Sequence, residues 1–178
     1  PRAGVKDMLL SLAVILVPVL LIVWFFTRTP DEPNIQQIAW RPVVVSARSY
    51  AGYPVLAPRE VPEEWRPTKA RYVNKGDRWV GSTISAGNRW ELGFLTSQNL
   101  YLAVNQSDEP SRAFVAAVTR SATEDGKVTV DRYTWTKMIS PDGRTRALVT
   151  RIGSSTAVIV ADASYPLLTD FAGMLTMS

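Results

Sequence analysis

The sequence predicts an α+β fold, in which a curved antiparallel β-sheet of about six strands packs against a C-terminal helix. From residue 68 onward, several short segments alternate apolar and polar side chains, a period of two that is typical of half-buried strands. The connections between these segments are of hairpin length, which favours antiparallel pairing over β-α-β crossovers. The last apolar segment of the chain has helical spacing instead.

The first strand is expected at 68–72, where Thr, Ala and Tyr alternate with Lys and Arg. Segment 78–84 is a weaker strand candidate. Residues 90–94 alternate apolar side chains with Glu and Gly, and 101–106 follow after a short polar connection as the hairpin partner. Further strands are expected at 128–135, 147–149 and 156–161.

Two helices are expected in the same domain. Ser111 can cap a short helix whose apolar stripe is formed by Phe114, Val115 and Val118. Ser164 can cap the final helix, which has a proline in its first turn, where a missing N–H costs little. The apolar face of this final helix comprises Leu167, Leu168, Phe171, Met174 and Leu175.

The N-terminal segment Met8–Phe26 contains no charged residue. Its length corresponds to about 28 Å of helix, which matches the hydrocarbon core of a bilayer. A cleaved signal peptide would be shorter and would end in small residues, whereas this segment ends in bulky aromatic ones that suit a membrane interface. The sequence therefore predicts one transmembrane helix, with an anchor that includes Met8, Leu12, Leu16, Pro18, Leu21, Trp24, Phe25 and Phe26.

This interpretation divides the chain into a cytoplasmic tip (1–7), the transmembrane helix (8–26), a proline-rich stalk (27–62) and an α+β domain (63–178). Val43–Val45 within the stalk could pair as an early strand. Basic residues before the helix slightly favour a cytoplasmic N-terminus. The predicted location is the plasma membrane, with a single pass and the C-terminal domain outside the cytoplasm.

The composition excludes several kinds of chemistry. The chain has 178 residues but no histidine and no cysteine, so it cannot form a Ser-His-Asp triad, a thiolate nucleophile or a histidine- or cysteine-ligated metal site. The 20 basic and 16 acidic residues alternate along the chain without a long run of one sign, which argues against nucleic-acid binding. No phosphate-binding or calcium-loop motif occurs, and we expect no cofactor, no metal and no enzymatic activity.

Carboxylates are the remaining candidates for catalysis, because they can act without histidine. Glu91 alternates with core aromatic residues and is expected to face solvent or a cleft. Asp131 and Asp162 could be buried with a perturbed pKa, which the sequence leaves open. The acidic pairs elsewhere are interpreted as turns and helix caps.

Six tryptophans form the other unusual feature of the composition. Trp65, Trp90 and Trp135 occupy inward strand positions and are expected in the core. Two other tryptophans lie in polar surroundings and could be exposed contacts for a partner or a glycan. Two tyrosines of the proline-rich segment could also contact a neighbour, although packing back onto the domain is favoured for them. These candidates are Trp40, Tyr50, Tyr53 and Trp79.

Five segments appear in an order and spacing that are similar to a known family. They are PVLAP at Pro54–Pro58, VPEEWRPTKARY at Val61–Tyr72, WELGFLT at Trp90–Thr96, FVAAVT at Phe114–Thr119 and RALVTRIGSSTAVIVADAS at Arg146–Ser164. The chain resembles an actinobacterial family with a single N-terminal anchor, known as domain of unknown function 4245. The resemblance implies a topology and a cell-envelope setting, and it implies no catalytic residue.

Three hypotheses for function follow. The first is a non-enzymatic, single-pass accessory subunit of a membrane or cell-envelope complex, a respiratory complex being one candidate. Its partners are then the lipid bilayer and other integral membrane subunits. The alternative is a free-standing envelope module that binds lipid or cell-wall material between the sheet and the C-terminal helix. A carboxylate-dependent hydrolase is the least favoured.

Overall fold

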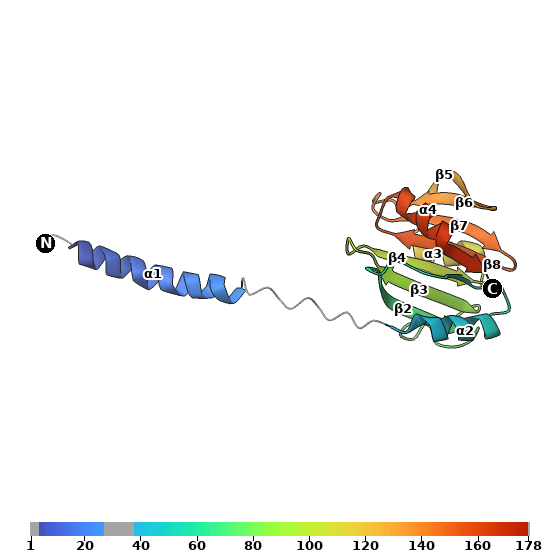
Figure 1. The fold of residues 1–178 in the computed structure, drawn as a ribbon, viewed down its shortest axis with the longest axis horizontal. Coiled ribbons are helices and arrows are strands. Elements are labelled where there is room, and N and C mark those ends of the chain that lie inside the picture. Colours follow the sequence, from blue (N-terminus) through green and yellow to red (C-terminus); the bar gives the residue numbers. More distant parts are fainter. Residues whose placement is uncertain (1–3, 27–37, 178) are drawn as a thin grey trace. The chain divides into compact units, whose positions relative to one another are not determined.

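The computed structural model describes residues 4–26 and 38–177 and divides the chain into two compact units, 1–35 and 36–178. Within the N-terminal unit, helix α1 spans Val5–Phe26 and contains Pro18 (Figure 1). Its described side chains run from Met8 to Trp24 and are exposed. The side chains of Phe25 and Phe26 lie outside the described residues.

The structure does not support the predicted transmembrane helix. To cross a bilayer, a helix must be both long and apolar over about 30 Å. Among the residues that the structure describes, no helix meets that requirement. Met8–Phe26 is helical as expected, but its interpretation as a membrane anchor is wrong. The single-pass plasma-membrane location and the extracytoplasmic position of the C-terminal domain, which both depended on it, are overturned by the same finding.

The C-terminal unit (36–178) is built on an antiparallel sheet of seven strands, where about six were expected. The strand order is β2-β3-β4-β8-β7-β6-β5. Every neighbouring pair is antiparallel, as predicted for strands joined by short connections, and β4 and β8 pair across a longer separation in sequence. The strands are β2 (Arg66–Val73), β3 (Arg89–Leu95), β4 (Tyr101–Ser107), β5 (Thr123–Val130), β6 (Tyr133–Ile139), β7 (Arg146–Ile152) and β8 (Ser155–Ala161). Segment 78–84 contributes an isolated bridge between Arg78 and Ile84 rather than a strand.

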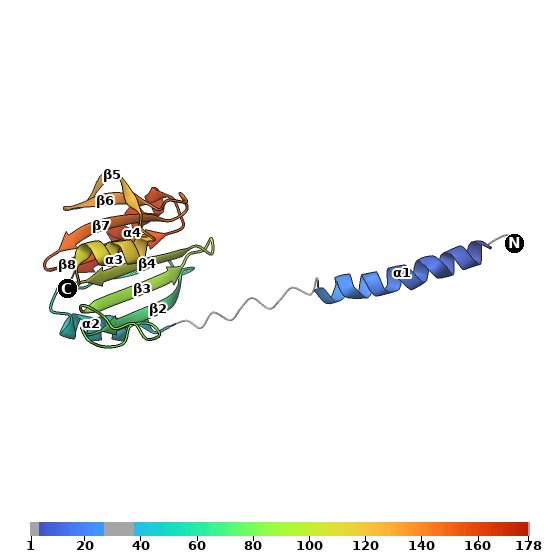
Figure 2. The same ribbon diagram turned by 180° about the vertical axis from the view of Figure 1, so that it is seen from behind.

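Helices cover both faces of this sheet. Helix α4 (Tyr165–Met174) lies on one face (Figure 1), and α3 (Ser111–Thr119) lies on the opposite face (Figure 2). Helix α2 (Trp40–Tyr50) packs along edge strand β2. A two-stranded ribbon of β1 (Leu56–Pro58) and β9 (Leu175–Met177) completes the unit. The mixed α+β architecture agrees with the predicted class.

The segment interpreted as a stalk has a different structure where it is described. Residues 27–37 lie outside the described residues, but α2 and β1 both fall within 38–62. Val43–Val45 belong to a helix rather than a strand, because Trp40, Val44 and Ala47 form a buried helical face. Pro42 is tolerated because the first turn of a helix has no intrahelical partner for its N–H.

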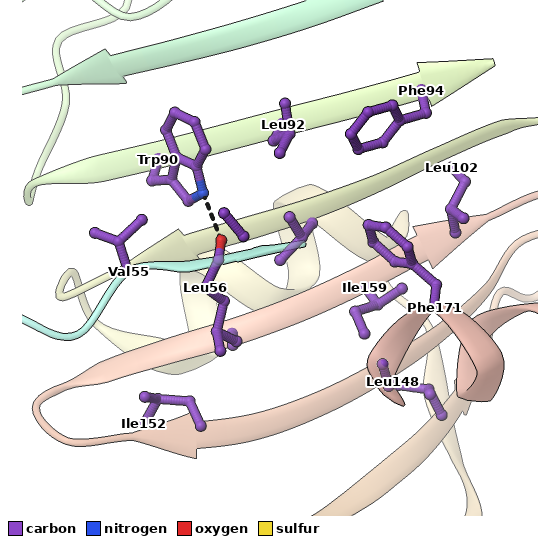
Figure 3. Packing of buried hydrophobic residues seen from close by; sticks show 14 of the residues in the cluster. Val55, Leu56, Trp90, Leu92, Phe94, Leu102, Leu148, Ile152, Ile159 and Phe171 are labelled. Carbon is purple, nitrogen blue, oxygen red and sulfur yellow. Dashed lines mark hydrogen bonds between the residues drawn. The ribbon is translucent and has the colours of Figure 1, made fainter. Parts of the chain in front are cut away.

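The main core lies between the sheet and the layer formed by α4, α2 and β1 (Figure 3). Phe94 is its centre, with ring centroids 5.9 Å from Trp40, 6.2 Å from Trp65 and 5.9 Å from Phe171. Trp65, Trp90 and Trp135 are buried, as predicted. A smaller cluster of Phe114, Ala147 and Val158 fixes α3 on the other face, consistent with the predicted apolar stripe.

Candidate functional site

A cavity of the C-terminal unit lies between the β5–β6 hairpin and the β1–β9 ribbon. We call it the C-terminal hollow; it has a volume of about 340 Å³. Its lining comprises Leu56, Val130, Asp131, Arg132, Tyr133, Trp135, Ala172, Leu175, Thr176 and Met177. A small-molecule site is usually a concave, mostly apolar cavity with a few polar groups, and this volume is at the lower end of the usual range.

Local sequence explains how the hollow is formed. Val130 pairs with Tyr133, so Asp131 and Arg132 form a two-residue connection at its rim. Asp131 has φ +52°, a left-handed conformation that aspartate tolerates better than most residues. On the opposite side, Met177 belongs to β9 and pairs with Leu56. Segments from the middle and the end of the chain therefore enclose one cavity.

The polar groups of the hollow form a short chain at its rim. The Nε–H of Arg132 donates to the hydroxyl oxygen of Tyr133 at 3.1 Å, and its guanidinium carbon lies 5.3 Å from the centroid of that ring. The Tyr133 hydroxyl in turn donates to Sδ of Met177 at 3.5 Å. These contacts orient the tyrosine ring as one wall, and they present a guanidinium and a carboxylate to any molecule that enters.

The three carboxylates singled out from the sequence occupy separate elements. Glu91 is on β3, Asp131 is in the β5–β6 connection, and Asp162 follows β8. Among the described residues, no group of three acidic side chains is arranged to hold a metal ion. Asp162 accepts a hydrogen bond from the Thr145 hydroxyl at 2.5 Å and lies 3.9 Å from Nη1 of Arg120.

Glu91 does not face solvent or a cleft as expected, because it is only 7% exposed. The buried aromatic side chains of β3 lie on one face, and Glu91 lies on the other, which Lys69 and Tyr101 cover. Its Oε1 is 2.9 Å from Nζ of Lys69 and accepts a 3.5 Å hydrogen bond from the Tyr101 hydroxyl. Burial raises the pKa of Tyr101, and the Glu91 carboxylate raises it further, so the phenol stays protonated.

Three of the four predicted partner contacts are buried. Trp40 lies in the main core, and Trp79 and Tyr53 are no more than 8% exposed. Tyr53 donates to the carbonyl oxygens of Asn88 at 3.1 Å and Gln106 at 3.2 Å. Tyr50 is 69% exposed and remains available to a partner.

Trp79 is held by two arginines from neighbouring strands. The guanidinium carbon of Arg89 lies 4.3 Å from its ring centroid, and that of Arg71 lies 4.8 Å away. Arg71 also donates a hydrogen bond to the Trp79 carbonyl oxygen. Cation–π contacts of this kind fix the β2–β3 connection against the sheet. Val80 and Ile84 in the same connection are 53% and 57% exposed.

The C-terminal hollow was not predicted from the sequence. Its lining comes from segments that are separated by more than 100 residues, and pairing between Leu56 and Met177 brings them together. The sequence feature that indicates the hollow is the row of apolar residues that continues beyond the final helix. This row does not show which other segments of the chain it packs against.

A family model described as "Protein of unknown function (DUF4245)" matches residues 2–175. The chain belongs to this family. The DUF4245 match extends over both units and confirms the resemblance drawn from the five sequence segments; the actinobacterial origin stays a prediction. No curated protein and no solved structure matches this DUF4245 chain.

Proposed function

We propose that the C-terminal unit is a non-enzymatic binding module that takes an apolar small molecule, or the apolar part of an amphiphile, into the C-terminal hollow. The observation that carries this proposal is the hollow itself, a preformed cavity of about 340 Å³ with mostly apolar walls. The absence of histidine and cysteine from the sequence supports a non-enzymatic role.

The chemistry of the walls supports an apolar or amphiphilic ligand. Tyr133, Trp135 and Met177 offer flat and polarisable surfaces that favour apolar groups. Asp131 and Arg132 lie at one side and supply a polar end. A ligand with one apolar body and one hydrogen-bonding end fits this distribution, which is the class that the alternative hypothesis described as lipid or cell-wall material.

A neutral fluorescent probe tests the proposal. N-phenyl-1-naphthylamine fluoresces in apolar surroundings and carries no charge, so titration into the full chain measures occupancy of an apolar cavity. We expect saturable binding with one probe per chain. Met177→Trp should fill the hollow and weaken binding about tenfold or more, the effect of losing roughly 1.4 kcal/mol of contact.

Thr129→Trp is the matched control for that experiment. Thr129 is exposed on β5 and neighbours Val130 without lining the hollow, so the added indole should leave the affinity of the probe unchanged. Non-saturable binding, or equal affinity in both variants, contradicts the proposed site. Thermal unfolding of each variant establishes that the fold is retained.

A second candidate, an accessory subunit of a protein complex, is supported by a different feature. In the β2–β3 connection, Val80 and Ile84 are exposed, whereas Trp79 is buried and contacts Arg71 and Arg89. Exposed apolar side chains beside an anchored aromatic residue are suited to contact with a partner protein. Gentle purification followed by mass spectrometry should recover a stoichiometric partner, and Val80→Asp with Ile84→Asp should release it. Retention of the partner by that variant contradicts the contact.

A further inference from the structure

A second hollow, of about 250 Å³, lies between helix α2 and the β1–β9 ribbon. Three arginines line it: Arg41 and Arg48 from α2, and Arg59 directly after β1. Trp40, Val44 and Thr176 contribute to the remaining wall. We call this cavity the arginine hollow. Its lining contains no acidic residue.

The helix places two of the arginines on one face. Arg41 and Arg48 are seven residues apart, which is close to two helical turns, and Val44 lies between them on the same side. Arg59 directly follows β1 and lines the same hollow from the side of the ribbon. These arginines were not expected together, because 27–62 was predicted to be a stalk in which Val43–Val45 could pair as a strand.

None of the three guanidinium groups forms an ion pair with a described residue. In the described part of the chain, the ion pairs join Lys69 to Glu91, Arg89 to Glu109 and Arg120 to Asp162. Arg41 instead lies 5.2 Å from the centroid of the Trp40 ring. Like charges around one cavity repel each other unless solvent or a bound anion compensates them.

Arg48 supplies an independent observation. Its Nε atom is buried and has no hydrogen-bond acceptor in the described part of the chain. A buried N–H that has lost water costs free energy until an acceptor is provided, and such an orphan often marks an unoccupied site for water or an ion. Arg48 lines the hollow, so an anionic group bound there would lie beside its guanidinium group and offset the clustered positive charge.

From this arrangement we infer that the arginine hollow binds a phosphate-bearing ligand. Guanidinium groups are planar forks that match phosphate oxygens in a bidentate manner, and three of them can neutralise a doubly charged group. The inference stands independently of the proposed function, because it concerns a different cavity. The two hollows share Thr176 in their linings. A phosphate group in the arginine hollow can come from a free anion or from the head group of a lipid.

Isothermal titration of the full chain with inorganic pyrophosphate, and separately with water-soluble dihexanoyl phosphatidic acid, tests the inference. We expect both to bind. Equal affinities identify the phosphate group alone as the ligand, and tighter binding of the phosphatidic acid identifies a lipid head group as its source. Arg48→Met should weaken both about tenfold to a hundredfold, the effect expected for losing a hydrogen bond to a charged group.

Two further variants make the result decisive. Arg59→Met changes an exposed residue of the hollow and should weaken binding without disturbing the fold. It keeps the inference testable if Arg48→Met destabilises the protein. Arg112→Met removes an exposed arginine on α3, outside the hollow, and should leave the affinity unchanged. Failure of both probes to bind the wild-type chain overturns the inference. Equal affinities of the Arg48, Arg59 and Arg112 variants would also overturn the inference, because binding would then depend on overall charge and not on the hollow.

Discussion

The side-chain amide oxygen of Gln106 accepts a hydrogen bond from the backbone N–H of Leu56 at 2.9 Å. The amide nitrogen of the same residue donates to the Pro54 carbonyl oxygen at 2.7 Å and to the Ser155 hydroxyl at 2.8 Å. Gln106 is fully buried. The indole of Trp90 adds a 3.0 Å hydrogen bond to the Leu56 carbonyl oxygen (Figure 3). These buried polar contacts fix β1, and hence both hollows, to the main sheet.

Replacing Gln106 by methionine should therefore destabilise the C-terminal unit. The change preserves side-chain volume but leaves the buried N–H of Leu56 and the carbonyl of Pro54 without partners, for which we expect a loss of about 2–4 kcal/mol in the free energy of unfolding. Urea unfolding measures this loss. Gln98→Met, at an exposed position in the β3–β4 connection, is the control and should change stability little. A cost at Gln106 no greater than that at Gln98 would contradict the role assigned to the amide.

The buried hydroxyl of Tyr53 should make stability depend on alkaline pH. Burial, followed by the nearby Asp108 carboxylate, raises the pKa of Tyr53 well above its ordinary value of 10.0. The folded state thus prefers the neutral phenol. This contribution is fully present below the pKa of the unfolded chain and is lost as pH rises above it, because only the unfolded tyrosine then ionises.

Tyr53→Phe checks this dependence. The variant loses hydrogen bonds to two carbonyl oxygens, so we expect it to be less stable than the wild type by about 1–2 kcal/mol near neutral pH. The difference should shrink as pH rises above about 10, because phenylalanine does not titrate. Chemical unfolding of both proteins along a pH series gives the comparison, with Tyr50→Phe as the exposed control. A difference that stays constant or grows with pH contradicts the argument.

Gly93 and Tyr101 should show strong coupling in a double-mutant cycle. A Cβ atom added at Gly93 would lie 2.3 Å from the hydroxyl oxygen of Tyr101, so the ring must move. Gly93→Ala should cost about 1–3 kcal/mol, and most of that cost should disappear when Tyr101 is alanine. Unfolding free energies of the four proteins measure the coupling. Additive costs would show that the backbone, not the tyrosine ring, requires glycine.

Arg89 should be more important for stability than its neighbour Arg71. Its guanidinium lies 3.6 Å from a Glu109 carboxylate oxygen and covers both Trp79 and Phe114. Arg89→Met should destabilise the unit by about 1–3 kcal/mol, since it leaves the half-buried carboxylate without its charge partner. Adding Glu109→Gln should restore part of this loss, and urea unfolding of the single and double variants detects the recovery. Arg71→Met is the matched variant and should lower the free energy of unfolding by less. If Glu109→Gln restores no stability to Arg89→Met, an unpaired Glu109 carboxylate is not the reason for the loss.

Much of the sheet could be predicted from local patterns. Alternation at 68–72 and 90–94 identified β2 and β3, and the short polar connection after 96 identified the β3–β4 hairpin. These features succeed because one face of each strand packs against the core and because a short loop permits only antiparallel return. Pairing between β4 and β8 could not be predicted from local patterns, since three strands and a helix separate these strands in sequence.

Burial of polar and aromatic residues was harder to predict than secondary structure. Trp40 and Trp79 have polar sequence neighbours, yet one packs on Phe94 and the other lies beneath two arginines. Glu91 occupies the face opposite the core aromatics, but Lys69 and Tyr101 bury it. In each case the covering group comes from a different strand or loop, so local alternation carries no information about it.

The sequence by itself determined the α+β class, most of the strands, the final helix and the exclusion of histidine and cysteine chemistry, because these depend on residue types and on spacing within one segment. Only the tertiary structure decided that 40–58 form a helix and a strand of the folded unit, and that two cavities flank the β1–β9 ribbon. Helix α2 packs on β2 and on Phe94, and β1 pairs with β9 from the far end of the chain, so both depend on contacts between separate segments. The folding of α2 against the β1–β9 ribbon also brings Arg41, Arg48 and Arg59 to the lining of one hollow.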